Sequence, residues 1–282
     1  MQTTTTVQPT SNSTQKFLIS AANSTVIYAL AYLLVNGLHQ VATMLMASRL
    51  QVRGAWDMSK ISYSLSNSEW WRTAVIAVYG VGPLVVAVVG LIAYQWYWRK
   101  QRAQRGLFKL LLLWIAIHAC NAVLGALVAD TMLQTGFWYV PAWLFQLGDI
   151  VNGLLAFVAA VSLLLIGYSL SVAFLQAHDS RTVMKYENRQ RMVASTIFLP
   201  WIVGSFLLSL AKTPVFSLIE GTHFASLLLL LLPMSAGCLN EMFGSTVRNP
   251  QKTRVAWGLL VVLWVVLLGW RLLLSPPILF GA

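Results

Sequence analysis

The feature that most constrains this chain is a series of long apolar stretches separated by short polar or basic connections. A helix of about 20 apolar residues is long enough to cross the ~30 Å hydrocarbon core of a bilayer. The stretches cover residues of about 25–47, 67–98, 107–129, 147–175, 192–211, 222–242 and 255–274. The sequence therefore predicts an all-α fold, a polytopic membrane helix bundle with about seven transmembrane helices.

The composition supports a bilayer as the solvent of this bundle. Hydrophobic residues make up 58% of the chain and charged residues only 10%, whereas soluble domains carry about a quarter charged residues. Such a chain cannot cover a water-facing globule with polar side chains. We expect a single transmembrane domain over residues 23–282, in contact with lipid. Residues 1–22 are rich in Thr, Ser, Asn and Gln, and we expect them to form a disordered tail.

The basic residues predict the orientation of the bundle. The net charge is +11, and the Lys and Arg residues lie between apolar spans, which is typical of membrane proteins rather than of proteins that bind nucleic acid. The connections 99–109, 176–191 and 243–254 hold twelve Lys and Arg, and the connections 48–69, 131–146 and 212–221 hold four. The richer side faces the cytoplasm by the positive-inside rule. We expect a bacterial inner membrane protein with a cytoplasmic N-terminus.

Three short segments outside the spans also allow predictions. The alternating run ISYSLS at 61–66 indicates a short strand. The run Ser66–Glu69 fits a capping box, which predicts that the second span begins there. His178 lies in a charged connection, so we expect water to surround it.

Several ionisable and polar side chains fall inside the spans or at their ends. Such groups are costly in a bilayer unless they are paired, so each is a candidate for a functional role. Two histidines and a carboxylate at one depth would suit zinc or another divalent metal, and the candidate ligands are His39, His118 and Asp149. A wider intramembrane polar cluster comprises Asn36, Thr43, Asn121, Asp130, Glu220 and His223.

Two other roles fit the same residues equally well. A transporter would use them to bind a proton or a cation. A purely structural subunit would use them to hydrogen-bond neighbouring helices, and those at the ends of spans would simply contact water. The spacing of the residues does not separate these possibilities.

One part of the chain resembles a known family. Residues 28–95 combine a first helix that carries the run His39-Gln40-Val41-Ala42-Thr43 with a second helix that carries Gly82-Pro83. This order is similar to the start of the site-2-protease family of intramembrane zinc metalloproteases. The first helix of that family carries His-Glu-x-x-His, and its next helix carries a Gly-Pro.

The resemblance implies a metal site with His39 as its first ligand. Gln40 stands at the position of the catalytic Glu, and Thr43 stands at that of the second His. Gln cannot abstract a proton from metal-bound water, and Thr is a poor zinc ligand. The family's later Asp-Gly motif has only a loose counterpart at Asp149. The resemblance therefore implies a relative without peptidase chemistry, which binds another membrane protein's transmembrane segment near His39. The alternatives are an ion or solute transporter subunit that uses His39, His118, Asp130 and Asp149, and a structural membrane subunit.

Overall fold

The computed structural model describes residues 11–66, 68–214, 217–243 and 254–281. Within these ranges, seven helical segments are long and apolar enough to cross a membrane. They cover Thr14–Arg49, Arg72–Gln101, Phe108–Leu133, Asp149–Gln176, Tyr186–Ala211, Leu218–Leu239 and Trp257–Leu274. The predicted all-α membrane bundle is confirmed, and the protein is a multi-pass membrane protein that contacts lipid.

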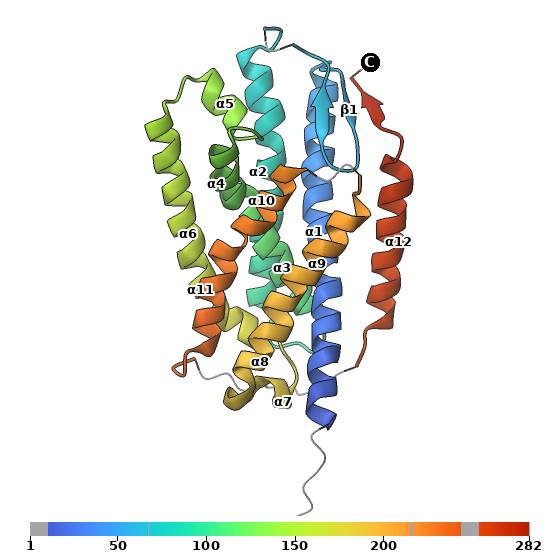
Figure 1. Ribbon diagram of the computed structural model, residues 1–282, viewed down its shortest axis with the longest axis vertical. Helices are drawn as coiled ribbons and strands as arrows, with labels where there is room; N and C mark the ends of the chain where they lie inside the picture. The colour runs from blue at the N-terminus through green and yellow to red at the C-terminus, as the bar shows by residue number, and fades with distance from the viewer. Residues whose placement is uncertain (1–10, 67, 215–216, 244–253, 282) are drawn as a thin grey trace, which may run out of the picture.

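The elements follow one another in an up-and-down arrangement (Figure 1). In chain order they are α1 (Ser11–Arg49), β1 (Gly54–Trp56), β2 (Ile61–Tyr63), α2 (Arg72–Trp96), the π-helical turn η1 (Tyr97–Gln101), α3 (Phe108–Cys120), the π-helical turn η2 (Asn121–Gly125), α4 (Ala126–Leu133), α5 (Tyr139–Leu144), α6 (Asp149–Gln176), α7 (Arg181–Met184), the 3-10 turn η3 (Tyr186–Asn188), α8 (Arg189–Val193), the π-helical turn η4 (Ala194–Phe198), α9 (Leu199–Ala211), α10 (Leu218–Ser226), α11 (Leu228–Leu239), α12 (Trp257–Leu274) and β3 (Ile278–Phe280).

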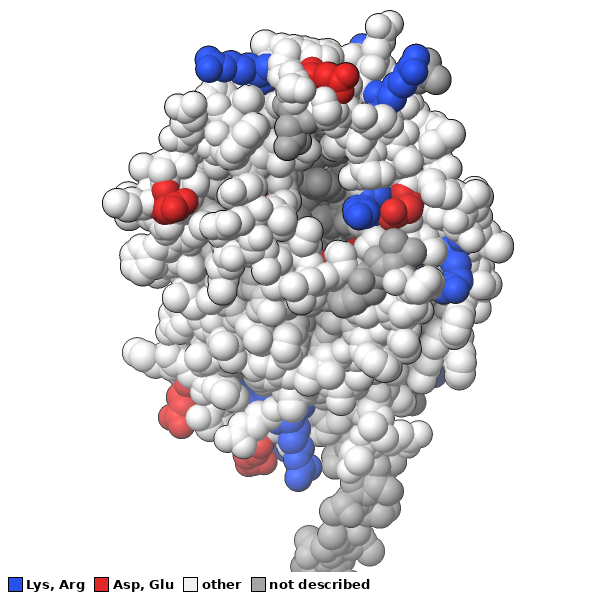
Figure 2. Space-filling model, turned by 45° about the horizontal axis from the view of Figure 1, so that its top comes forward, with Lys and Arg blue, Asp and Glu red and all other residues white. Residues whose placement is uncertain are grey.

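The bundle has two distinct ends (Figure 1). We call the end that carries the β-strands the hairpin end and the opposite end the α7 end. At the hairpin end, the three short strands form an antiparallel sheet of order β2-β1-β3. Strand β2 confirms the predicted strand over its first three residues, Ile61–Tyr63. Figure 2 shows Lys, Arg, Asp and Glu side chains at the two ends and a few near mid-height, on a surface that is otherwise mostly uncharged.

Helix α1 is the central element, packed against α2, α3, α9 and α12. Its 39 residues give it a length of roughly 58 Å, which exceeds the thickness of a hydrocarbon core. In the half nearer the α7 end, the Tyr28 ring meets Trp114 of α3 edge-on, with ring centroids 5.0 Å apart. Both side chains are fully buried. Helix α12 buries little of its surface and presents most of it outward.

The predicted disordered tail is partly wrong. Helix α1 begins at Ser11, so residues 11–22 of the expected tail are helical, whereas residues 1–10 lie outside the described part of the chain. The physical reason is the burial of two apolar residues on this turn of the helix, Phe17 and Ala21. Phe17 packs into the main hydrophobic core, and this contact stabilises a segment whose composition alone suggests disorder.

The start of the second span also differs from its prediction. The Glu69 carboxylate does accept hydrogen bonds from the Ser66 backbone N–H, at 2.7 Å, and from its hydroxyl, at 2.8 Å. These bonds close a separate turn, and they hold the pKa of Glu69 below its usual range. Helix α2 begins only at Arg72, after an extended residue at Trp71. Strong local hydrogen bonding therefore marks a turn here, and the helix starts after it.

Candidate functional site

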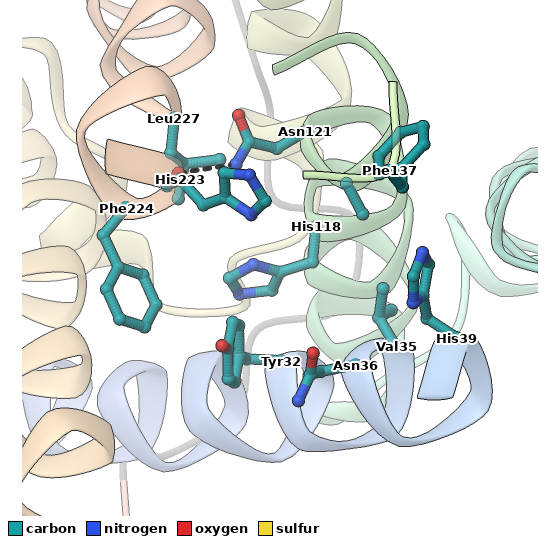
Figure 3. Close-up of a pocket in the computed structure, with 11 residues that line it drawn as sticks. Tyr32, Val35, Asn36, His39, His118, Asn121, Phe137, His223, Phe224 and Leu227 are labelled. Atoms are coloured by element: carbon teal, nitrogen blue, oxygen red, sulfur yellow. Dashed lines mark hydrogen bonds between the residues drawn. The ribbon is translucent and has the colours of Figure 1, made fainter. Parts of the chain in front are cut away.

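A small cavity with polar and apolar walls lies inside the bundle, in the half nearer the hairpin end. Its volume is about 100 Å³, which is room for a few water molecules or a small ligand. The cavity is lined from α1 by Tyr32, Val35, Asn36 and His39, from α3 and η2 by His118, Asn121 and Ala122, from the α4–α5 connection by Phe137, and from α10 by His223, Phe224 and Leu227. We call this cavity the histidine pocket (Figure 3).

His118 is the most enclosed histidine of the pocket. Figure 3 shows its ring between α1, which carries Tyr32 and Asn36, and the side that carries His223 and Asn121. The His118 ring lies edge-on to Tyr32 at 5.7 Å between centroids. Its Nε2 and the Asn36 Nδ2 are buried and have no hydrogen-bond partner among the described residues. Since buried polar groups are almost always paired, both nitrogens suit a ligand or water in the pocket.

His223 connects the pocket to a fully buried carboxylate. Its Nε2 lies 3.2 Å from Asp130 Oδ1, and 31% of the His223 side chain is exposed, against none of Asp130. The second carboxylate oxygen accepts a hydrogen bond from the Trp138 backbone N–H at 3.0 Å. The turn that supplies this N–H passes through Gly136, whose φ of +98° favours glycine. A Cβ at Gly136 would also overlap the Asp130 carboxylate.

The π-helical turn η2 places Asn121 against α10. Such turns widen a helix and are frequent at functional sites. The Asn121 Nδ2 donates a 2.8 Å hydrogen bond to the His223 carbonyl, and its Oδ1 accepts one of 3.1 Å from the Ser226 hydroxyl. These two bonds fix the α10 segment that carries His223. Asn121 therefore acts as a positioning residue for that histidine.

The side chains of His39 and Gln40, in the motif that resembles His-Glu-x-x-His, face different parts of the structure. His39 lines the pocket, with its ring 5.8 Å from Phe137. The Thr43 hydroxyl donates to the His39 carbonyl at 2.9 Å. Gln40 faces the strands: its Oε1 accepts from Trp56 Nε1 at 2.5 Å, and its Nε2 donates to the Ser59 carbonyl at 3.2 Å. Gln40 thus holds the hairpin against α1, and it does not line the pocket.

The candidate metal ligands do not all come together. His39 and His118 line one pocket, whereas Asp149 is an exposed residue at the start of α6 and is not part of its lining. Within the described ranges, no group of three or more His, Cys, Asp and Glu residues could hold a metal ion. The prediction of a His39, His118 and Asp149 site therefore has no support from this geometry.

Glu220 belongs to a separate polar network beside the pocket. Its carboxylate pairs with Lys212, and its Oε2 accepts a 2.6 Å hydrogen bond from the Ser59 hydroxyl. The Tyr32 hydroxyl donates to Glu220 Oε1 at 3.5 Å and accepts from Lys212 Nζ at 3.3 Å. Burial lowers the pKa of Lys212, and the Glu220 carboxylate opposes that shift. Tyr32 thus links this ion pair to the pocket.

The prediction for His178 is wrong. Its side chain is buried at the α7 end, in the turn after α6, with its ring edge-on to Phe174 at 5.1 Å between centroids. The connection that contains it folds against α3, where Lys109 pairs with Asp179. This contact buries His178, although its position in a charged connection predicts exposure to water.

Three contributors were missed in the sequence: Tyr32, Phe137 and Lys212. Tyr32 had a usable signal, because it precedes Asn36 by four residues and His39 by seven, which is the spacing of one helix face. Phe137 lies in a connection between helices, where no helical periodicity predicts which way its side chain faces.

Comparisons with protein-family models, with curated proteins and with solved structures found no match to this chain.

Proposed function

We propose that the protein is a subunit of an ion transporter and that the histidine pocket carries protons. The observation that supports this is the convergence of three helices on one cavity: α1 brings His39, α3 brings His118, and α10 brings His223. Asp130 of α4 lies behind His223 as its ion-pair partner. Histidine changes its charge near neutral pH. Ionisable groups that face a cavity inside a membrane mark ion and proton pathways.

The His223–Asp130 pair is the proposed entrance for the proton. A protonated imidazole is attracted to a carboxylate at 3.2 Å, and a neutral imidazole is attracted much less. The partly exposed His223 ring takes a proton from water at the hairpin end. Water in the pocket then passes it to the unpartnered Nε2 of His118. His223 becomes neutral again, and His118 carries the positive charge.

The aromatic layer of Tyr28 and Trp114 closes the pocket toward the α7 end. Tyr28 precedes Tyr32 by one helical turn, and Trp114 precedes His118 by one turn, so both rings lie directly beyond the pocket. Release of the proton at the other side requires this layer to rearrange. The excess of Lys and Arg in the connections at the α7 end supports a cytoplasmic N-terminus in a bacterial inner membrane. Protons then enter from the outside.

Proton flux into sealed vesicles tests this proposal. The purified protein is reconstituted into liposomes that contain a pH-sensitive dye, and the external pH is lowered. Wild-type vesicles are expected to acidify faster than empty vesicles, and His118→Ala is expected to remove at least nine-tenths of the added rate. Asp149→Asn is the matched control, because this exposed carboxylate lies outside the pocket, and its rate should equal that of wild type. Wild-type flux equal to that of empty vesicles would rule out proton carriage.

A second candidate is a non-catalytic relative of the intramembrane metalloproteases that binds a partner's transmembrane segment near His39. One specific observation favours it. A Cβ at Gly82 would lie 2.8 Å from His39 Nε2 and 2.6 Å from Thr43 Oγ1. The Gly-Pro of α2 and the histidine of α1 therefore meet, as a shared ancestry with that family requires.

Elemental mass spectrometry of a double variant tests the second candidate. In a metalloprotease relative, Gln40→Glu with Thr43→His would restore near-stoichiometric zinc. We expect no gain of zinc, because Gln40 faces the strands and the Thr43 side chain fills the narrow space against Gly82 of α2. A gain of zinc that is lost again with His39→Ala would favour the relative over the transporter.

A further inference from the structure

A second cavity lies at the α7 end, far along the bundle from the histidine pocket. Its volume is about 310 Å³, and it opens between α1, the turn after α6, and the first residues of α3 and α12. The side chains used below are those of Asn23, His178, Asp179 and Arg254, all of which line it. We call it the basal cavity. Nothing in the proposed proton pathway uses it.

Two long helices begin at the basal cavity. The residues that precede α3 and α12, Leu107 and Ala256, both line it. The start of a helix carries a partial positive charge and free backbone N–H groups, so it favours anions. Asn23 of α1 fixes the start of α12: its Oδ1 accepts from the Ala256 N–H at 2.9 Å, and its Nδ2 donates to the Arg254 carbonyl at 2.8 Å.

His178 provides an independent sign of a ligand. Only 8% of the residue is exposed, and its Nε2 is buried without a hydrogen-bond partner among the described residues. Burial and the nearby Lys109 ammonium lower the pKa of His178 to about 4, although Asp179 opposes the shift. A neutral imidazole still has one N–H to donate. The buried His178 Nε2, without a hydrogen-bond partner among the described residues, indicates that a ligand binds in the cavity.

The charge balance of the basal cavity favours an anion. Among the described residues of its lining, Asp179 alone has a carboxylate, and both oxygens are already occupied: Oδ1 by Lys109 Nζ at 2.5 Å and Oδ2 by the Gly106 N–H at 2.7 Å. Lys109 also donates to the Gln176 carbonyl at 3.2 Å. With this pair neutral, the exposed Arg254 side chain gives the described part of the lining a net positive charge.

We infer that the basal cavity binds a phosphate group, held by Arg254, the His178 imidazole and the starts of α3 and α12. Arginine and helix N-termini are the usual partners of phosphate oxygens in proteins. The cavity lies at the starts of the candidate spans Phe108–Leu133 and Trp257–Leu274, so an anionic lipid headgroup and a free phosphate compound could both reach it and would present the same chemistry.

The test compares the two sources of phosphate with the full-length protein. In one arm, inorganic phosphate is titrated against protein in a neutral detergent, and the unfolding temperature is followed by tryptophan fluorescence. In the other arm, native mass spectrometry counts the phosphatidylglycerol that the protein retains from mixed vesicles of phosphatidylglycerol and phosphatidylcholine. The variants are Arg254→Ala and His178→Phe, which keeps an aromatic ring against Phe174. Lys185→Ala is the control for the loss of an exposed cation at the same end.

We expect one of the two ligands to bind wild type and Lys185→Ala alike, and at least tenfold more weakly to Arg254→Ala and His178→Phe. Stabilisation by inorganic phosphate identifies a soluble compound, and selective retention of phosphatidylglycerol identifies a headgroup. If neither ligand distinguishes Arg254→Ala or His178→Phe from Lys185→Ala, the phosphate site is refuted. The phosphate-binding test does not depend on proton flux in vesicles. Failure of the phosphate site can therefore be distinguished from failure of the proposed proton pathway.

Discussion

The imidazole of His223 lies 3.2 Å from the carboxylate of Asp130, and the two side chains differ completely in their access to water. His223 is 31% exposed and Asp130 is not exposed at all. A buried carboxylate at this distance attracts the imidazole when the ring is protonated. This pair lies at the edge of the histidine pocket, and the first prediction concerns a change to its carboxylate.

Asp130→Asn is expected to lower the rate of proton entry into vesicles at least tenfold while the fold is kept. The amide oxygen can still accept the hydrogen bond from the Trp138 N–H, so the free energy of unfolding should change by no more than about 1 kcal/mol. Vesicle flux and unfolding in denaturing detergent measure the two quantities. A variant with unchanged flux would show that Asp130 serves only to fix the turn after α4.

Gly136→Ala is expected to destabilise the protein by about 1–3 kcal/mol, because the residue has a positive φ and its Cβ would overlap the Asp130 carboxylate. The matched control is Gly148→Ala, at which a Cβ meets nothing within 4 Å. Thermal unfolding of the purified variants compares the two. Equal unfolding temperatures would contradict the tight turn over Asp130.

Gln40→Ala is expected to loosen the strands at the hairpin end. The change leaves the Trp56 indole N–H and the Ser59 carbonyl without their hydrogen bonds to Gln40, at a cost of about 1–3 kcal/mol. Hydrogen exchange should rise in the β1–β2 segment and remain unchanged in α6. Gln190→Ala, an exposed position on α8, serves as the comparison. Protection of β1 and β2 that survives the change would refute a structural role for Gln40.

The stability of the protein is expected to fall in mildly acidic solution because of His178. Its folded-state pKa is about 4, below the ordinary value of about 6.5. Between these values the unfolded chain binds the proton more readily, so the free energy of unfolding decreases as the pH falls through this window, by at most about 3 kcal/mol. Above about pH 6.5 the contribution is constant. Unfolding curves from pH 7 to 4 should be flatter for His178→Phe than for wild type, and parallel curves would contradict this assignment.

The sequence was sufficient to predict the class of the fold and the number of spans, since apolar stretches of bilayer length leave few other choices. It also indicated most of the polar side chains that meet in the pocket, because the cost of such groups in lipid makes them conspicuous. It did not show which of them meet. His118 and His223 converge through the packing of α3 and α10, and no local spacing encodes that contact. Asp149 looked equivalent to Asp130 in the sequence, yet it is exposed and Asp130 is fully buried.

The misassigned segments share one physical cause. Residues 11–22 look disordered by composition and His178 looks solvated by its charged neighbours, but tertiary contacts decide both. Phe17 packs into the core, and the Lys109–Asp179 pair draws the turn that contains His178 against α3. Contacts between distant parts of the chain override local composition at these positions.

The most direct test of the proton pathway is the rate of proton entry into wild-type vesicles as a function of external pH, measured beside empty vesicles. A histidine pathway predicts a rate above that of empty vesicles, which increases as the external proton concentration is raised. His118→Ala should remove this rise. A wild-type rate equal to that of empty vesicles at every pH would contradict a proton-carrying role for the histidine pocket.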